Sequence, residues 1–113
     1  GNDIWTAAGA GNIEAVKQHL AKGVDVDAKN KDGATALHAA AFLGQYEVAE
    51  LLIQKGADVN VRGGKGETPI DSLKVDWGIT EFVASLLQLK LDREKVETGR
   101  AKVAELLRQH GAK

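Results

Sequence analysis

The sequence predicts an all-α protein, a solenoid in which pairs of short helices stack one upon the next. Self-comparison gives the first observation, because a shift of 33 residues places Gly11 on Gly44 and Gly23 on Gly56. Composition gives the second: 43% of the 113 residues are apolar but only 4% are aromatic, so Ala, Val, Leu and Ile must form the core. A repeated unit rich in small apolar side chains favours closely packed helical repeats.

The middle copy, residues 30–62, indicates how one unit is built. Asp32 and Gly33 form a turn pair, after which Thr35 is placed to cap a first helix. Gly44 ends that helix, because glycine adopts a positive φ at little cost. The unit leaves one apolar face uncovered on its own, so copies must stack to bury it.

A second helix is predicted from about Tyr46 to Lys55, where apolar residues recur at helical spacing. Gly56 ends it. The unit is therefore a turn followed by two antiparallel helices. It resembles the ankyrin repeat, whose 33-residue unit carries a Thr-Pro-Leu-His-x-Ala signature. Here the signature reads TALHAA from Thr35 to Ala40, with alanine in place of proline, and the family's ending GADVN is present in full.

This resemblance implies a solenoid of helical hairpins joined by short turns. It also implies that His38 forms a structural hydrogen bond with Thr35. The outer copies depart from the pattern, as repeats that cap a stack do. The first, residues 1–29, reads NDIW at the signature, and the third, residues 63–113, reads TPID. We therefore predict a single domain of three repeats, of which only the middle one is typical.

The third copy is lengthened by 22 residues, a helical insertion at about 76–97. Thr68 and Val103 lie 35 residues apart, whereas the matching Thr35 and Val48 lie 13 apart. Apolar residues in the insertion form one stripe with helical spacing, made of Ile79, Phe82, Val83, Leu86, Leu87 and Leu91.

Asp76 or Thr80 is placed to cap this inserted helix. Burying the six apolar side chains would contribute on the order of 10 kcal/mol before entropy losses. We therefore expect the helix to close the end of the stack. A seam between two copies of the chain is the alternative, and a monomer is favoured over a homodimer.

Asp92 is a candidate N-cap for a further helix. Gly99 falls on the turn residue Gly44 once the insertion is allowed for, and a glycine inside a helix costs roughly 1 kcal/mol relative to alanine. We therefore expect a short helix at about 93–98, a break at Gly99, and the second helix of the repeat at about 100–109. An unbroken helix is the alternative.

No group of residues predicts an active site, a metal site or a bound cofactor. The chain has no cysteine, and its three histidines, at positions 19, 38 and 110, are far apart in the predicted stack. The segment RGGKGET at 62–68 lacks the GxxxxGK[ST] spacing of a phosphate loop, so we interpret it as a turn between repeats. The carboxylates Asp71 and Asp76 have no partner acid or base. We expect a protein that is not an enzyme.

The charge of the chain narrows the kind of macromolecule that it is expected to bind. The net charge is −1, with acidic and basic residues interleaved, which argues against nucleic acid or an anionic membrane surface as the main partner. No apolar run reaches the length of a membrane-spanning helix. The expected partner is another protein, and the resemblance implies that it binds to the turn tips and to the first helices, which line a concave face.

Positions carried over from the family give the candidate partner-binding residues. They are Lys31, Asp32, Ala34, Phe42, Leu43, Arg62, Lys65, Glu67, Val75, Asp76 and Trp77, with Gly9, Ala10 and Lys29 from the first copy. Most are polar or small. The large apolar ones, Phe42 and Leu43 with Val75 and Trp77 nearby, have the composition of an interface centre. The alternative, which we favour, is that the inserted helices fold back and cover them.

Overall fold

The computed structural model describes residues 3–74, 77–86, 88, 90 and 92–112. Within these ranges the chain is all helical and has no strand, which confirms the predicted fold class. The elements in chain order are α1 (Ile4–Ala10), α2 (Ile13–Ala21), α3 (Ala36–Phe42), α4 (Tyr46–Gln54), the 3-10 helix η1 (Asp71–Lys74), α5 (Trp77–Leu86) and α6 (Arg93–Gln109).

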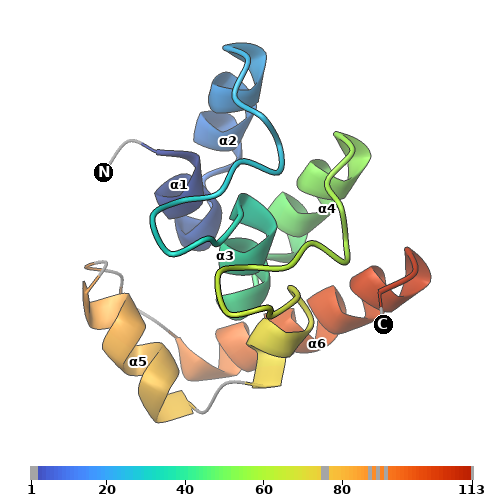
Figure 1. Cartoon of the computed structure of the whole chain (residues 1–113). Helices are drawn as coiled ribbons and strands as arrows, with labels where there is room; N and C mark the ends of the chain where they lie inside the picture. Colours follow the sequence, from blue (N-terminus) through green and yellow to red (C-terminus); the bar gives the residue numbers. More distant parts are fainter. Residues whose placement is uncertain (1–2, 75–76, 87, 89, 91, 113) are drawn as a thin grey trace.

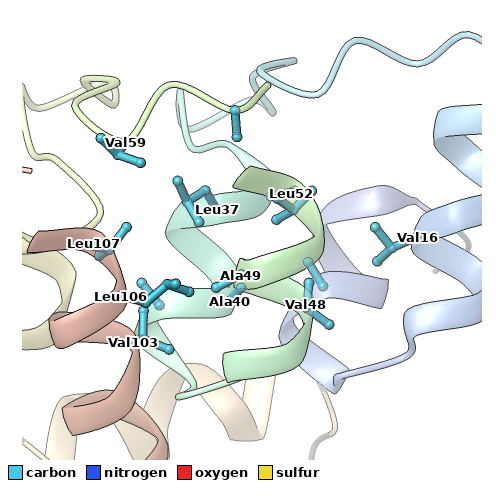
Figure 2. Packing of buried hydrophobic residues seen from close by; sticks show 14 of the residues in the cluster. Val16, Leu37, Ala40, Val48, Ala49, Leu52, Val59, Val103, Leu106 and Leu107 are labelled. Carbon is cyan, nitrogen blue, oxygen red and sulfur yellow. The ribbon is translucent and has the colours of Figure 1, made fainter. Parts of the chain in front are cut away.

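The helices form two layers. α1, α3 and η1 lie next to one another in the first, and α2, α4 and α6 in the second (Figure 1). Aliphatic side chains fill the space between the layers, and Leu37, Leu52 and Leu107 are completely buried there (Figure 2). Full burial of one such side chain contributes about 1.5–3 kcal/mol, so the stack is held together by many small aliphatic contacts.

The predicted cap of the middle repeat is confirmed. The backbone N–H of Thr35 donates to Nδ1 of His38 at 3.2 Å, and the Thr35 hydroxyl lies 2.9 Å from the same nitrogen. Nδ1 therefore accepts, so Nε2 carries the proton and donates to the backbone carbonyl of Glu67 at 2.9 Å. His38 closes its own helix and also links it to the next turn.

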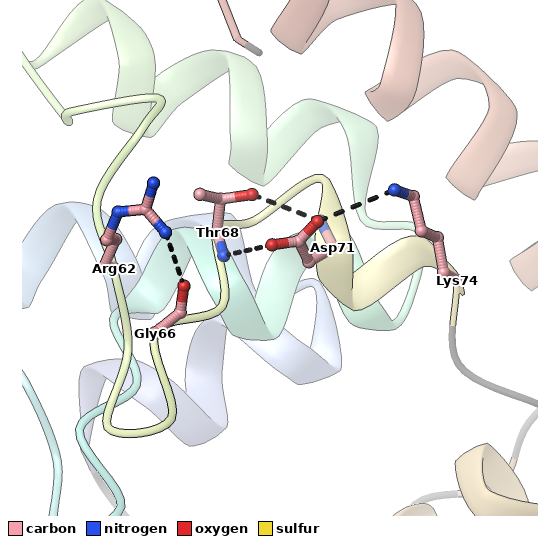
Figure 3. Close-up of polar contacts among 5 residues, drawn as sticks. All are labelled: Arg62, Gly66, Thr68, Asp71 and Lys74. Carbon is pink, nitrogen blue, oxygen red and sulfur yellow. Dashed lines mark hydrogen bonds and ion pairs between the residues drawn. The ribbon is translucent and has the colours of Figure 1, made fainter.

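The third repeat opens differently, because a single 3-10 turn stands where the first helix would be. Asp71 replaces the signature histidine: its carboxylate accepts from the Thr68 N–H at 3.0 Å, and its own N–H donates to the Thr68 hydroxyl at 3.4 Å (Figure 3). The bond from the Thr68 N–H holds the pKa of the Asp71 carboxyl below its ordinary value. Lys74 lies 3.7 Å from the same carboxylate.

The break expected at Gly99 is wrong, because α6 runs unbroken through it. Asp92 is the N-cap, as predicted, and accepts from the Lys95 N–H at 3.2 Å. Gly99 is needed for a close crossing: a Cβ added there would collide with the carbonyl oxygen of Gly44. Gly44, at φ 68° after the end of α3, would in turn place a Cβ 2.5 Å from the carbonyl oxygen of Val96. The two glycines let α6 lie directly on the turn between α3 and α4.

The inserted stripe is also not buried as expected. α5 turns Ile79, Phe82 and Leu86 outward, at 56%, 60% and 69% exposure, and Val83 is half-buried. Leu87, Leu91 and the candidate cap Asp76 lie outside the described residues. Thr80 does not cap the helix, since α5 begins at Trp77 and Thr80 is buried within it.

Candidate protein-interaction surface

Two successive turn tips, residues 29–34 and 62–67, form one continuous surface, the tip ledge. In the first tip, the Asn30 side chain accepts from the N–H groups of Asp32 and Ala34, at 2.9 and 3.0 Å. The Asn30 N–H donates to the carbonyl of Ala34 at 2.9 Å and closes the loop. This tip is therefore held by its own hydrogen bonds.

The second tip has the same shape but uses different side chains. Gly63 stands where Asn30 does and has no side chain to offer, so the Glu67 carboxylate accepts from the Lys65 N–H at 3.0 Å. The Gly63 N–H donates to the Glu67 carbonyl at 2.7 Å, and Arg62 donates to the carbonyl of Gly66 at 2.9 Å (Figure 3). The segment RGGKGET is thus a closed turn, as interpreted from its sequence.

The tips touch through their backbones. A Cβ on Gly33 would lie 2.5 Å from the backbone nitrogen of Gly64, and one on Gly64 would meet the carbonyl of Asp32. His38 fixes the second tip from below through its bond to Glu67. The tip ledge is therefore a surface ordered by its own hydrogen bonds.

Most of the predicted tip residues are accessible. Lys29, Lys31, Asp32, Arg62 and Lys65 are exposed, whereas Ala34 and Glu67 are half-buried. The ion pairs among the described residues are Glu14–Lys17, Asp71–Lys74 and Arg93–Glu97, so none involves a lysine of the tip ledge. The ledge carries more cations than carboxylates and presents them to solvent.

The predicted apolar centre on the concave face is largely closed. Leu43 is only 2% exposed, so it is covered, as favoured, but by α1 and not by the inserted helices. It lies against Gly9, where an added Cβ would be 3.1 Å from a Leu43 methyl carbon, and Gly9 is itself buried. Ala10 stays exposed and Trp77 is half-buried. Val75 and Asp76 lie outside the described residues.

Phe42 is half-buried beneath Arg100 of α6. The guanidinium lies 5.1 Å from the centre of the Phe42 ring, and its Nε donates to the Phe42 carbonyl at 2.6 Å. Its Nη2 donates to the buried hydroxyl of Thr80 on α5, also at 2.6 Å. Burial lowers the pKa of Arg100 from its ordinary value. Arg100 is the residue that sequence reasoning missed, and it joins α3, α5 and α6 at one point.

Within the described ranges, no helix has both the length and the apolar character needed to cross a membrane. No group of three or more His, Asp or Glu side chains among the same residues is placed to hold a metal ion.

Comparison with known proteins identifies the family. A model of ankyrin repeats, in three copies, matches residues 4–97. A putative ankyrin repeat protein of Rickettsia bellii is 40% identical over 97 residues, which cover 80% of this chain and 56% of that protein. An ankyrin repeat-containing protein of Schizosaccharomyces pombe is 37% identical over 68 residues, 60% of this chain and 33% of the relative.

A serine/threonine-protein kinase of Arabidopsis thaliana is 32% identical over 106 residues, 94% of this chain but only 18% of the kinase. The chain thus spans between a third and just over half of the two ankyrin proteins, and a small part of the kinase. The chain belongs to the ankyrin-repeat family, whose repeats generally serve as protein–protein interaction modules.

Proposed function

We propose that this chain is a non-enzymatic module that binds another protein through the tip ledge, with the first helices of the concave face beside it. The observation that carries the proposal is a rigid, exposed ledge whose lysines are not engaged in ion pairs within the described chain. Complementary charge gives specificity and speeds association. The ledge therefore favours an acidic segment of a partner protein, while the net charge of −1 over the whole chain disfavours nucleic acid.

The concave helices contribute less than their sequence suggests. Leu43 is buried between α1 and α3, and the Phe42 ring is covered by Arg100. Ala10, at the end of α1, is one of the positions there that stay exposed, and its side chain is small. We therefore assign recognition mainly to the charged side chains of the two tips.

A second candidate is a unit that associates with itself through α5. One observation favours it: the apolar row of α5 faces solvent instead of the stack. Both functions can coexist, because the ledge and α5 belong to different segments of the chain.

The test is a charge reversal on the ledge, Lys31→Glu with Lys65→Glu. The matched control is Lys22→Glu, which reverses an exposed lysine at the end of α2. We expect the double variant to lose proteins that the unmodified chain captures from its native host, as identified by mass spectrometry, and the control to keep them. An unchanged set of captured proteins with the folded double variant would contradict recognition by the ledge.

A further inference from the structure

Contacts on the inner face of α5 hold the apolar row on the opposite face in its outward direction. The row consists of Ile79, Phe82 and Leu86. On the inner face the buried hydroxyl of Thr80 accepts from Arg100, and Ala84 is only 2% exposed. Rotating the row inward would separate Thr80 from Arg100 and set aliphatic groups against a half-buried guanidinium. Because polar groups cannot be buried without partners at low cost, the exposed row follows from the sequence of the inner face.

No other helix covers this row within the described part of the chain. α5 is the one helix there without an extended packing contact with another, and Figure 1 shows it standing apart from the two layers. With about 200 Å² for each complete side chain, the three exposed fractions amount to roughly 400 Å² of apolar surface. An apolar patch of that size is as large as the largest on a typical monomer and commonly marks a contact site.

The row is self-complementary. If two copies of α5 lie antiparallel, residues whose numbers add to about 165 face each other, as in other antiparallel helix pairs. Ile79 then faces Leu86 of the second copy, and the two Phe82 rings meet near the two-fold axis. A symmetric contact of this kind uses the same patch on both partners.

Charge does not oppose such a pair. Glu81 is the one charged residue of α5, and it lies outside the row formed by Ile79, Phe82 and Leu86. Beside the two ends of the helix, Lys74 is paired with Asp71 and Arg93 with Glu97. Within the apolar row itself, the antiparallel contact therefore brings no charged side chains together.

We infer that a second copy of this chain occupies the row, as an antiparallel pair of α5 helices. This inference deepens the second candidate function and does not depend on the tip ledge. Two rows bury roughly 800 Å² together, less than the about 1,200 Å² at which stable interfaces begin. The dimer is therefore weak and reversible.

Sedimentation equilibrium of the full chain from micromolar to millimolar concentration tests the association. We expect a monomer–dimer equilibrium, weakened at least tenfold by Phe82→Glu and unchanged by Lys22→Glu, with circular dichroism verifying that both variants are folded. A chain that stays monomeric at every concentration would overturn the inference. The inference would also be overturned if Phe82→Glu left the association unchanged but lost a foreign protein that the original chain captures, because the row would then bind that protein.

Single cysteines test the geometry, since the chain has none of its own. Under mild oxidation, Ile79→Cys mixed with Leu86→Cys should give a cross-linked dimer of the two variants, while each variant alone should cross-link several-fold less. Strong self-linking of each variant would indicate a parallel pair and overturn the antiparallel arrangement. Unchanged partner capture by the ledge variant, with dimerisation intact, would remove only the proposed binding by the tips.

Discussion

In the first two repeats, helix pairs of seven and nine residues pack evenly against one another. In the third repeat a four-residue 3-10 turn and a 17-residue helix take their place, with α5 between them. Aliphatic burial holds both regions, since Val103, Leu106 and Leu107 of α6 belong to the same apolar cluster as the first two repeats. The third repeat adds two contacts of its own, the glycine crossing between Gly99 and Gly44 and the bonds of Arg100. The difference indicates that the altered repeat relies on specific contacts in addition to the shared core.

The bonds made by the fourth residue of the signature also differ from repeat to repeat. Trp5 occupies the signature position of the first repeat and donates from its indole N–H to the carbonyl of Ala28, in the next loop, at 2.9 Å. His38 makes the corresponding link to Glu67. Asp71 keeps the cap but, being an acceptor when ionised, cannot donate to a further loop. The signature residue of the third repeat therefore differs from those of the first two in making only its local cap.

The largest expected effect comes from the glycine crossing. Gly99→Ala should improve helix propensity by about 1 kcal/mol, yet its Cβ collides with the backbone carbonyl of Gly44. Because a backbone group cannot move aside as a flexible side chain can, the overpacking should exceed the usual upper end of about 3 kcal/mol. We predict a net loss of stability in urea unfolding. Thr98→Ala, at the exposed neighbouring position of the same helix, is the control and should be neutral or stabilising. A Gly99→Ala protein more stable than the original would contradict the close crossing.

The next largest effect is expected at the helix caps of the second and third repeats. His38→Ala removes a buried cap and the bond to Glu67, so we expect a loss of about 1–3 kcal/mol in the free energy of unfolding. Asp71→Ala removes a cap that links no further repeat and should cost less. Equal losses in thermal unfolding of the two variants would mean that the link between repeats adds nothing.

A smaller effect is expected at the arginine that holds α5. Arg100→Met keeps the aliphatic stem but removes the bonds to Phe42 and Thr80, so α5 should open and its amides should exchange with solvent faster, at a cost of about 1 kcal/mol. Arg93→Met removes an exposed ion pair and a contact 5.3 Å from the Trp77 ring, and should change stability by less than about 0.5 kcal/mol. Unaltered exchange in the Arg100 variant would show that α5 is held by other contacts.

The smallest expected effect is on the stability of the fold at acidic pH. Because the folded pKa of Asp71 is lowered by the Thr68 N–H, its ionised form stabilises the fold above the ordinary pKa of about 3.9. That contribution disappears as the pH falls through the lowered folded value. Asp71→Asn should therefore lose slightly less stability than the original chain between about pH 5 and pH 2, measured as melting temperature. A variant with the same or a steeper acid dependence would argue against this cap.

The stacked repeats could be predicted from the sequence because each unit repeats the same local signals. Thr35, His38 and Gly44 have the roles that their positions indicate, and the repeat register fixes the tips. Gly99 could not be interpreted in this way, since a helix break and a close crossing both call for glycine and only the neighbouring backbone distinguishes them.

The orientation of α5 could not be predicted either. An apolar stripe normally indicates a buried face, and the contact that reverses it joins Thr80 to a residue 20 positions away. The same is true of Phe42, whose covering arginine lies 58 positions along the chain. Binding by the candidate residues of the tip ledge stays a prediction.

The outward-facing α5 is the central claim, and the reactivity of single cysteines measures it directly. Phe82→Cys and Ala84→Cys differ by two positions on one helix and lie on opposite faces of it. At micromolar concentration, where the proposed weak dimer would be dissociated, we predict that a thiol reagent labels the thiol at position 82 at nearly the rate of the unfolded protein, and the thiol at position 84 at least tenfold more slowly. Equal rates, or faster labelling at position 84, would contradict the account.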